Sequence, residues 1–157
     1  AYHYLMIAHR QYYAGHFDAA VRTCIKLCEY DDILEARCLY SLLALCALYA
    51  RFYGVCSRAF VKLETLDTMS EKERDEVETL AIQIFVAHAP VDPAPLPEVY
   101  MRCLDVGKTY KACTISGRAI QESTSFMCKS CRHHMLEREK DKNNVQVCPL
   151  CHAPLQG

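Results

Sequence analysis

The sequence predicts a mainly α-helical fold in which tetratricopeptide-like antiparallel helical hairpins are followed by a small, β-containing zinc-binding module. Apolar residues recur at helical spacing through most of residues 1–88, which is typical of amphipathic helices packed side by side. Further along, the pairs Cys128/Cys131 and Cys148/Cys151 are separated by sixteen residues. This spacing is typical of a four-thiolate zinc site.

The composition of the 157 residues fits a folded protein, because 52% of them are hydrophobic. Residues 98–157 carry nine basic and six acidic side chains, a net charge of +3, which is too weak to favour nucleic acid as a partner. No apolar run reaches eighteen residues, so we expect no transmembrane segment. The chain begins at Ala1, without a Met or a charged-then-apolar leader, and we expect it to be a piece of a longer protein.

The first predicted hairpin consists of two helices separated by Gly15. A helix over Tyr2 to Ala14 would place four residues on its inner face: Leu5, Ala8, His9 and Tyr12. Gly15 then ends it. The second helix has apolar residues at spacings of three and four: Phe17, Ala20, Val21, Cys24, Leu27 and Cys28. This pair resembles a tetratricopeptide hairpin.

A second hairpin is predicted after the cap residues Asp31 and Asp32. Its first helix would bury Leu39, Leu42, Leu43, Cys46, Tyr49 and Tyr53. Leu45 and Leu48 lie outside that stripe, so the helix is either sandwiched between neighbours or part of an interface. We therefore expect an apolar binding surface near Leu39 to Tyr53. Gly54 should break the helix before the next one.

That next helix should run from Val55 to Leu66, with an inner stripe of Val55, Ala59, Leu63 and Leu66. Ser70 and Glu73 then form a capping box for a fifth helix. Its inner stripe should be Val77, Leu80, Ala81, Ile84 and Phe85.

Residues 89–97 contain four of the six prolines and are predicted to be a semi-rigid linker. The sequence thus divides into a helical-repeat end over residues 1–88, the linker, and a zinc-binding module over residues 98–157. In the module, residues 112–115 and 119–121 should form a hairpin around Ser116-Gly117.

The remaining elements of the module follow the two cysteine pairs. Ser125 to Met127 should lead into the first pair and Val145 to Val147 into the second. Asn143-Asn144 is the expected turn between them, and Glu137 to Lys142 is too charged to be buried.

Four thiolates complete the tetrahedral coordination of Zn²⁺ and leave no position open for water or substrate, so the zinc should be structural. Further ligand-type side chains lie nearby, namely Cys103, Cys113, His133, His134 and His152. They leave a second zinc open, although the eight ligands of a two-metal module are not found in regular order, and one site is favoured. Cys24 and Cys28 lie on an apolar helical stripe and should pack in the core. With eleven cysteines, an odd number, we expect a reducing compartment, the cytoplasm.

The run YDDILEARCLYSLLALCALYARFYGVCSRAFVKLETL, with CTISGRAI, FMCKSC and CPLCHAPL, resembles the C-terminal part of the intraflagellar transport protein 121 family. The resemblance implies a non-enzymatic scaffold subunit of the intraflagellar transport A complex, with the other subunits of that complex as partners. It implies protein transport within cilia in the retrograde direction, membrane-protein entry, and a location at the cytoplasm, axoneme and basal body. It places zinc ligands at Cys128, Cys131, Cys148 and Cys151, and Cys113, His133 and His152 also match family-like positions.

Two other functions stay open on the residues alone. A RING-like ubiquitin ligase would use the zinc module to recruit a conjugating enzyme, but Cys131-Arg132-His133 does not supply the Cys-x-His order within an eight-ligand cross-brace. A zinc ribbon on nucleic acid would use the basic residues of the module, but acidic residues are interleaved with them. No set of nucleophile, base and orienting group and no phosphate-binding glycine loop is recognisable, which favours a scaffold over an enzyme.

Overall fold

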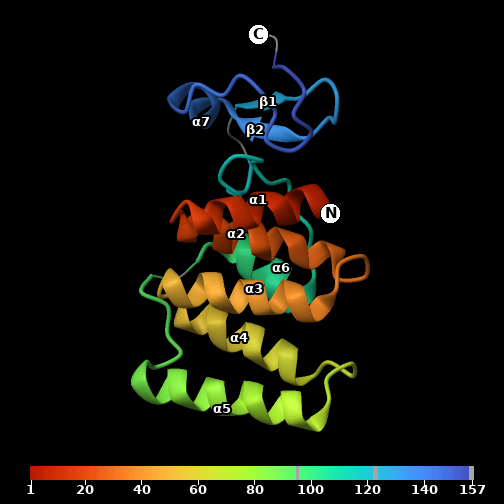
Figure 1. The fold of residues 1–157 in the computed structure, drawn as a ribbon. Helices are drawn as coiled ribbons and strands as arrows, with labels where there is room; N and C mark the ends of the chain where they lie inside the picture. The colour runs from red at the N-terminus through yellow and green to blue at the C-terminus, as the bar shows by residue number, and fades with distance from the viewer. Residues whose placement is uncertain (95, 122–123, 156–157) are drawn as a thin grey trace.

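A computed structural model describes residues 1–94, 96–121 and 124–155. Pro95 of the predicted linker lies outside the described residues, as do residues 122–123 and 156–157 of the predicted zinc module. The helices form a stack, and a small module with a two-stranded sheet sits against the first helix, at the opposite end from α5 (Figure 1). The predicted fold class is confirmed.

The first hairpin pairs α1 (Tyr2–Tyr13) with α2 (Phe17–Leu27), and Gly15 has a φ of 80° between them. The short 3-10 helix η1 (Cys28–Tyr30) continues α2. The predicted inner face of α1 was right in part: Ala8 is buried, and Leu5 and Tyr12 are half-buried against the core. The face is centred about one position away, because the other buried residues are Tyr4, Ile7 and Gln11. His9 is exposed. The face turns this way because α1 packs both on α2 and beneath the zinc module.

The second hairpin pairs α3 (Ala36–Tyr49) with α4 (Tyr53–Glu64). Asp31 and Asp32 were wrongly predicted as the cap: the buried side chain of Leu34 holds a turn first, and Glu35 occupies the cap position. Tyr49 was predicted to be inside but is 54% exposed. Helix α3 lies between α2 and α4, and its buried residues are Leu39, Tyr40, Leu42, Leu43, Ala44, Cys46 and Ala47.

Gly54 does not break α3, contrary to the prediction. The chain turns earlier, where Arg51 adopts a φ of 63°, and Gly54 is the second residue of α4. A Cβ atom at Gly54 would lie 2.9 Å from Oδ2 of Asp92. Glycine is therefore used here for the close approach of a side chain from the linker.

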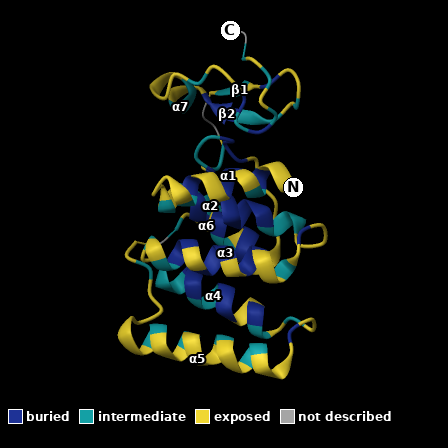
Figure 2. Cartoon of the chain, in the orientation of Figure 1, coloured by how far each residue is buried: buried dark blue, intermediate teal, exposed yellow. Residues whose placement is uncertain are grey.

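Helix α5 (Glu71–Ala87) begins as predicted, with the Ser70 hydroxyl accepting a bond from the Glu73 N–H at 3.2 Å. The Glu73 carboxylate does not complete the capping box but pairs with Arg37 of α3 at 2.6 Å. The predicted stripe faces α4, yet within the described structure α5 has no fully buried side chain, and Leu80 is 49% exposed. Figure 2 shows that α5 is less buried than α2 and α3.

The linker returns along the stack to α6 (Glu98–Val106), a helix that the sequence analysis missed. Asp92 accepts bonds from the N–H groups of Gly54 and Val55, at 2.9 and 3.3 Å, so it caps α4. Helix α6 packs on α2 and buries Tyr100, Cys103 and Leu104. The residue ranges predicted for the domains stay a prediction.

In the module, β1 (Ser125–Met127) pairs antiparallel with β2 (His134–Leu136), and α7 (Glu137–Lys142) follows. The predicted hairpin around Ser116-Gly117 is present as a turn with a single bridge, Ala112 to Ala119. Val147 likewise forms only a bridge, with Pro154. None of the helices that the structure describes is long and apolar enough to cross a membrane.

Candidate metal centre and its joint to the helices

The two cysteine pairs adopt the same backbone turn. In the first, the Cys128 N–H donates to the carbonyl oxygen of His133 at 2.9 Å, and the Arg132 N–H donates to the carbonyl oxygen of Cys128 at 2.8 Å. In the second, the Cys148 N–H donates to the carbonyl oxygen of Ala153, and the His152 N–H donates to the carbonyl oxygen of Cys148, both at 2.9 Å. The residue after each second cysteine has a positive φ, 62° at Arg132 and 65° at His152. Each turn therefore aims both of its sulfurs to one side.

The four sulfurs converge on one point. Those of Cys128 and Cys151 are 3.6 Å apart, those of Cys131 and Cys148 are 3.8 Å apart, and all four lie within 4.8 Å of one another. In a tetrahedron with Zn–S bonds of about 2.3 Å, the sulfurs are about 3.8 Å apart. The cluster therefore has the donor set and the dimensions of a four-thiolate zinc site.

Backbone and burial act on the thiols in opposite directions. Hydrogen bonds from the N–H groups of Cys131 and Ser130 lower the pKa of Cys128 to about 7. Burial raises the pKa of Cys131 to about 12 and also raises the pKa of Cys148. A bound divalent cation would favour the thiolate form of all four sulfurs.

The structure does not bring the other ligand-type residues into this cluster. The Cys113 sulfur accepts the N–H of Leu136 at 3.3 Å, and Nδ1 of His133 lies 3.0 Å from the Cys131 carbonyl oxygen. Nδ1 of His134 lies 3.2 Å from the Ser125 hydroxyl. The prediction of one favoured zinc site, with a second left open, stays untested.

The remaining candidate cysteines lie among the helices, and His152 is exposed. The Cys103 sulfur lies 3.4 Å from the Ile25 carbonyl oxygen, in the interface between α6 and α2. Cys24 is fully buried in α2, and Cys28 is half-buried at the start of η1. These three thiols are therefore packing residues.

A turn over residues 113–118 joins the zinc module to the first hairpin. The Gln11 side chain donates to the Ile115 carbonyl oxygen at 2.9 Å and accepts from the Thr23 hydroxyl at 2.7 Å. Arg22 donates to the Ser116 carbonyl oxygen at 3.1 Å. A Cβ at Gly117 would lie 2.8 Å from the Thr23 nitrogen, so the turn presses directly on α2.

Aromatic and charged groups extend the joint on both sides of that turn. The Lys26 ammonium group, in α2, pairs with Glu29, donates to the Tyr110 carbonyl oxygen and lies 5.2 Å from the Tyr110 ring centroid. The Tyr4 ring of α1 meets the His133 ring edge-on, with the two ring centroids 5.7 Å apart. The segment that precedes the cysteine pairs is therefore anchored to α1 and α2.

Sequence reasoning missed the residues of this joint. Gln11, Thr23 and Lys26 are polar or charged positions on otherwise buried helical faces, and that mismatch was the available signal. A buried polar side chain needs a hydrogen-bond partner. Gln11 and Lys26 find backbone carbonyl groups far away in the sequence, and Thr23 bonds to the Gln11 side chain on the neighbouring helix. Periodicity cannot identify such partners.

Fold and site together define a helical-repeat protein that carries a zinc-finger module. A family model described as "IFT121-like, TPR repeats" matches residues 1–92, and one described as "IFT121, second zinc finger domain" matches residues 111–156. The chain belongs to the IFT121 family, as the resemblance predicted.

Curated relatives agree with this assignment along the chain. It is 39% identical over 158 aligned residues to WD repeat-containing protein 35 of Rattus norvegicus and of Mus musculus, and 38% identical over 155 residues to that of Homo sapiens. Each alignment covers 99% of this chain but 13% of the relative. The chain thus spans about one eighth of the length of these proteins.

Proposed function

We propose that this chain is a non-enzymatic scaffold segment that binds other subunits of the intraflagellar transport A complex. The observation that carries the proposal is that matches to the IFT121 family extend over both the helical repeats and the zinc module. On this proposal the segment serves protein transport in the cilium, in the retrograde direction, and membrane-protein entry. Its locations are the cytoplasm, the axoneme and the basal body.

Zinc has a structural role in this proposal. Cys128, Cys131, Cys148 and Cys151 would hold one Zn²⁺, and four thiolates leave no open coordination position. The module has little core of its own beyond β1 and β2, and a module this small needs a metal or a similar cross-link to stay folded. The ion would then keep the turn over residues 113–118 in place against α1 and α2.

The test is co-precipitation of the tagged 157-residue chain from ciliated cells, probed with antibodies to the known subunits of the A complex. We expect those subunits to be recovered with the wild-type chain. Recovery should fall at least about tenfold with Cys148→Ser, which opens the zinc site. A folded, zinc-loaded wild-type chain that recovers no subunit would contradict the proposal.

The alternative functions give different results in simpler assays. A RING-like ligase would bind two zinc ions per chain and support ubiquitin transfer with a conjugating enzyme. A nucleic-acid-binding zinc ribbon would bind DNA or RNA with an affinity that falls steeply with salt. We propose that neither activity is present and that protein is the partner.

A further inference from the structure

An apolar groove runs between α3 and α5, over α4. It encloses about 450 Å³. Its lining is almost wholly apolar and comes from all three helices: Ala44, Leu45, Leu48, Phe60, Leu63, Val77, Leu80 and Ile84, with Ser41. Leu45 and Leu80 are 38% and 49% exposed. The apolar surface expected on α3 is therefore present, and α5 forms its second wall.

One end of the groove is acidic. It continues past Val77 and Leu80 to a shallower part lined also by Arg37, Glu73 and Glu76. Arg37 and Glu73 pair with each other, whereas Glu76 has no ion-pair partner among the described residues.

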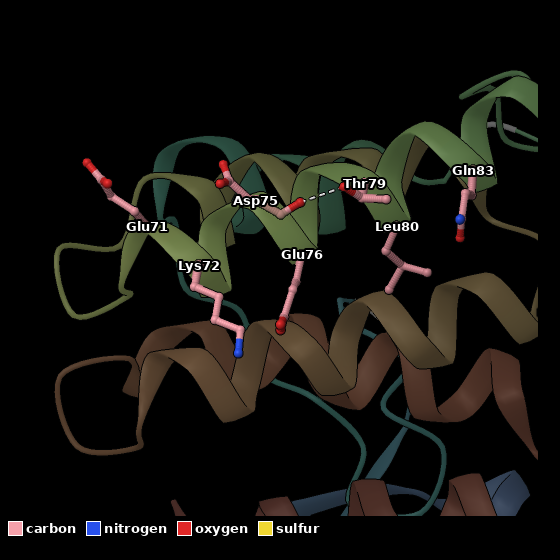
Figure 3. A pocket seen from close by; sticks show the side chains of 7 residues that line it. All are labelled: Glu71, Lys72, Asp75, Glu76, Thr79, Leu80 and Gln83. Carbon is pink, nitrogen blue, oxygen red and sulfur yellow. Dashed lines mark hydrogen bonds between the residues drawn. The ribbon is translucent and has the colours of Figure 1, made fainter.

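Figure 3 shows how α5 presents these groups. Lys72, Glu76 and Leu80 point from α5 toward the neighbouring helices, whereas Glu71 and Asp75 point away from them. The first eight residues of α5 contain five acidic residues and two basic ones, and Arg37 adds a third positive charge, so this end of the groove carries a net charge of −2. This excess of negative charge would attract a basic ligand.

The shape of the groove favours a helix as its occupant. Both walls are helices whose backbone hydrogen bonds are internal, so neither offers a strand edge for an extended peptide. From Arg37 to Leu48 the α3 wall is about 16 Å long, or three helical turns. A partner helix could place apolar side chains at i, i+3 or i+4, i+7 and i+11 along this length.

From these observations we infer that the groove between α3 and α5 binds an amphipathic helix of a partner protein, with its basic end beside Glu76. The inference rests on the proposed scaffold function and names the surface and the kind of partner. Apolar contacts along Leu45, Leu48 and Leu80 supply the affinity, and the acidic end sets the direction in which the helix lies.

A designed peptide tests the inference with the whole 157-residue chain. The probe is a fluorescein-labelled, 18-residue amphipathic helix with leucines at helical spacing and lysines at one end. Its matched control carries glutamates in place of those lysines. Fluorescence anisotropy should show the lysine peptide binding at least about tenfold more tightly than the glutamate peptide, a preference that weakens with salt. Equal binding of the two peptides, or none, would overturn the inference.

Paired variants on α5 locate the binding site. Leu80→Asp should weaken the lysine peptide at least about tenfold, whereas Ile82→Asp, at a residue that is 58% exposed and outside the groove, should leave it within about twofold. Glu76→Lys should remove the preference for lysine, and Glu78→Lys, outside the groove, should keep it. Both residues of each pair are partly or fully exposed, so melting temperatures should stay close to wild type. Equal losses within either pair would overturn the inference.

Co-precipitation of the same variants separates this inference from the proposed function. If Leu80→Asp loses the complex subunits while wild type and Ile82→Asp recover them, the groove inference and the scaffold function are both supported. If Leu80→Asp and wild type recover them equally, the groove is not the binding surface while the scaffold function is retained. Failure of the wild type contradicts the scaffold function itself. Self-association of the chain that Leu80→Asp abolishes would assign the groove to a second copy and overturn the inference.

Discussion

Gln11 of α1 donates its side-chain amide to the carbonyl oxygen of Ile115, at 2.9 Å, across more than one hundred residues of sequence. The oxygen of the same amide group accepts a hydrogen bond from the Thr23 hydroxyl, so a single side chain links α1, α2 and the turn that leads into the zinc module. Because Gln11 is only 7% exposed, its bonds form with little competition from water. The joint between repeat and module is therefore part of the folded core.

Gln11→Ala should destabilise the zinc-loaded chain by about 1–3 kcal/mol, because it leaves the half-buried Ile115 carbonyl oxygen and the buried Thr23 hydroxyl without their partner. The measurement is urea unfolding followed by circular dichroism. Arg10→Ala, one residue earlier and exposed, is the matched control and should change the free energy of unfolding by less than about 0.5 kcal/mol. Equal effects would show that the joint adds no stability.

Chelation tests the predicted division of the chain. We expect removal of zinc to unfold the module while the helical hairpins persist. Because Tyr100, Cys103 and Leu104 of α6 are buried against the helical stack, we expect α6 to stay folded with the repeats, which would move the boundary to about residue 107. Hydrogen exchange with and without a strong chelator would locate it. Loss of protection throughout α1 to α5 would instead show a single cooperative unit.

Cysteine substitutions separate the metal site from the core. Cys148→Ser removes one of the four converging sulfurs and should lower zinc content from about one ion per chain to a small fraction of that. Cys24→Ser, in the core of α2, should keep its zinc and lose only about 1–3 kcal/mol of stability. The measurements are metal analysis, for the zinc content of both variants, and thermal melting, for their stability. Equal zinc retention would contradict the assignment of Cys148 as a ligand.

Sequence periodicity identified α1 to α5 because each carries apolar residues at helical spacing, and the two cysteine pairs were legible from spacing alone. It failed where tertiary contacts decided the outcome. The inner face of α1 turned toward Tyr4 and Gln11 because the zinc module covers that side. No local pattern in residues 2–13 contains that information.

Local signals were also misread where one residue type serves two purposes. The sequence predicts that Gly54 breaks a helix, yet Gly54 admits the Asp92 carboxylate, and the turn itself is made by Arg51. The stripe of α5 was predicted but its exposure was not, because burial depends on which neighbours cover a helix. Helix α5 packs mainly on α4. The groove was visible only once α3 and α5 were placed together.

Stability should fall in mild alkali because buried thiols must stay protonated. Burial raises the pKa of Cys103 from 9.0 to about 11. The protonated Cys103 thiol therefore contributes fully to the free energy of unfolding below about pH 9. This contribution is lost as pH rises toward 11, by at most about 1.4 kcal/mol per pH unit. Urea unfolding between pH 8 and about pH 10.5 should show a steeper decline for wild type than for Cys103→Ala. Identical slopes would contradict this assignment.

The contact between Gly54 and Asp92 leads to a prediction in which a substitution changes sign. In wild type, Gly54→Ala should destabilise by about 1–2 kcal/mol, because the new Cβ would lie 2.9 Å from Oδ2 of Asp92 and displace the carboxylate that caps α4. In an Asp92→Ala background the obstacle is absent. Alanine is the better helix former by up to about 1 kcal/mol, so Gly54→Ala should now be neutral or stabilising.

Asp92→Asn separates shape from charge in the same cycle. Asparagine keeps the size of the aspartate side chain, so the cost of Gly54→Ala should persist in that background, although the lost charge weakens the cap on α4 by a few tenths of a kcal/mol. Urea unfolding of the six proteins gives the coupling free energy between the two positions, which we expect to be about 1–2 kcal/mol. A cost for Gly54→Ala that is unchanged by Asp92→Ala would mean that the linker does not close over α4 in the way described.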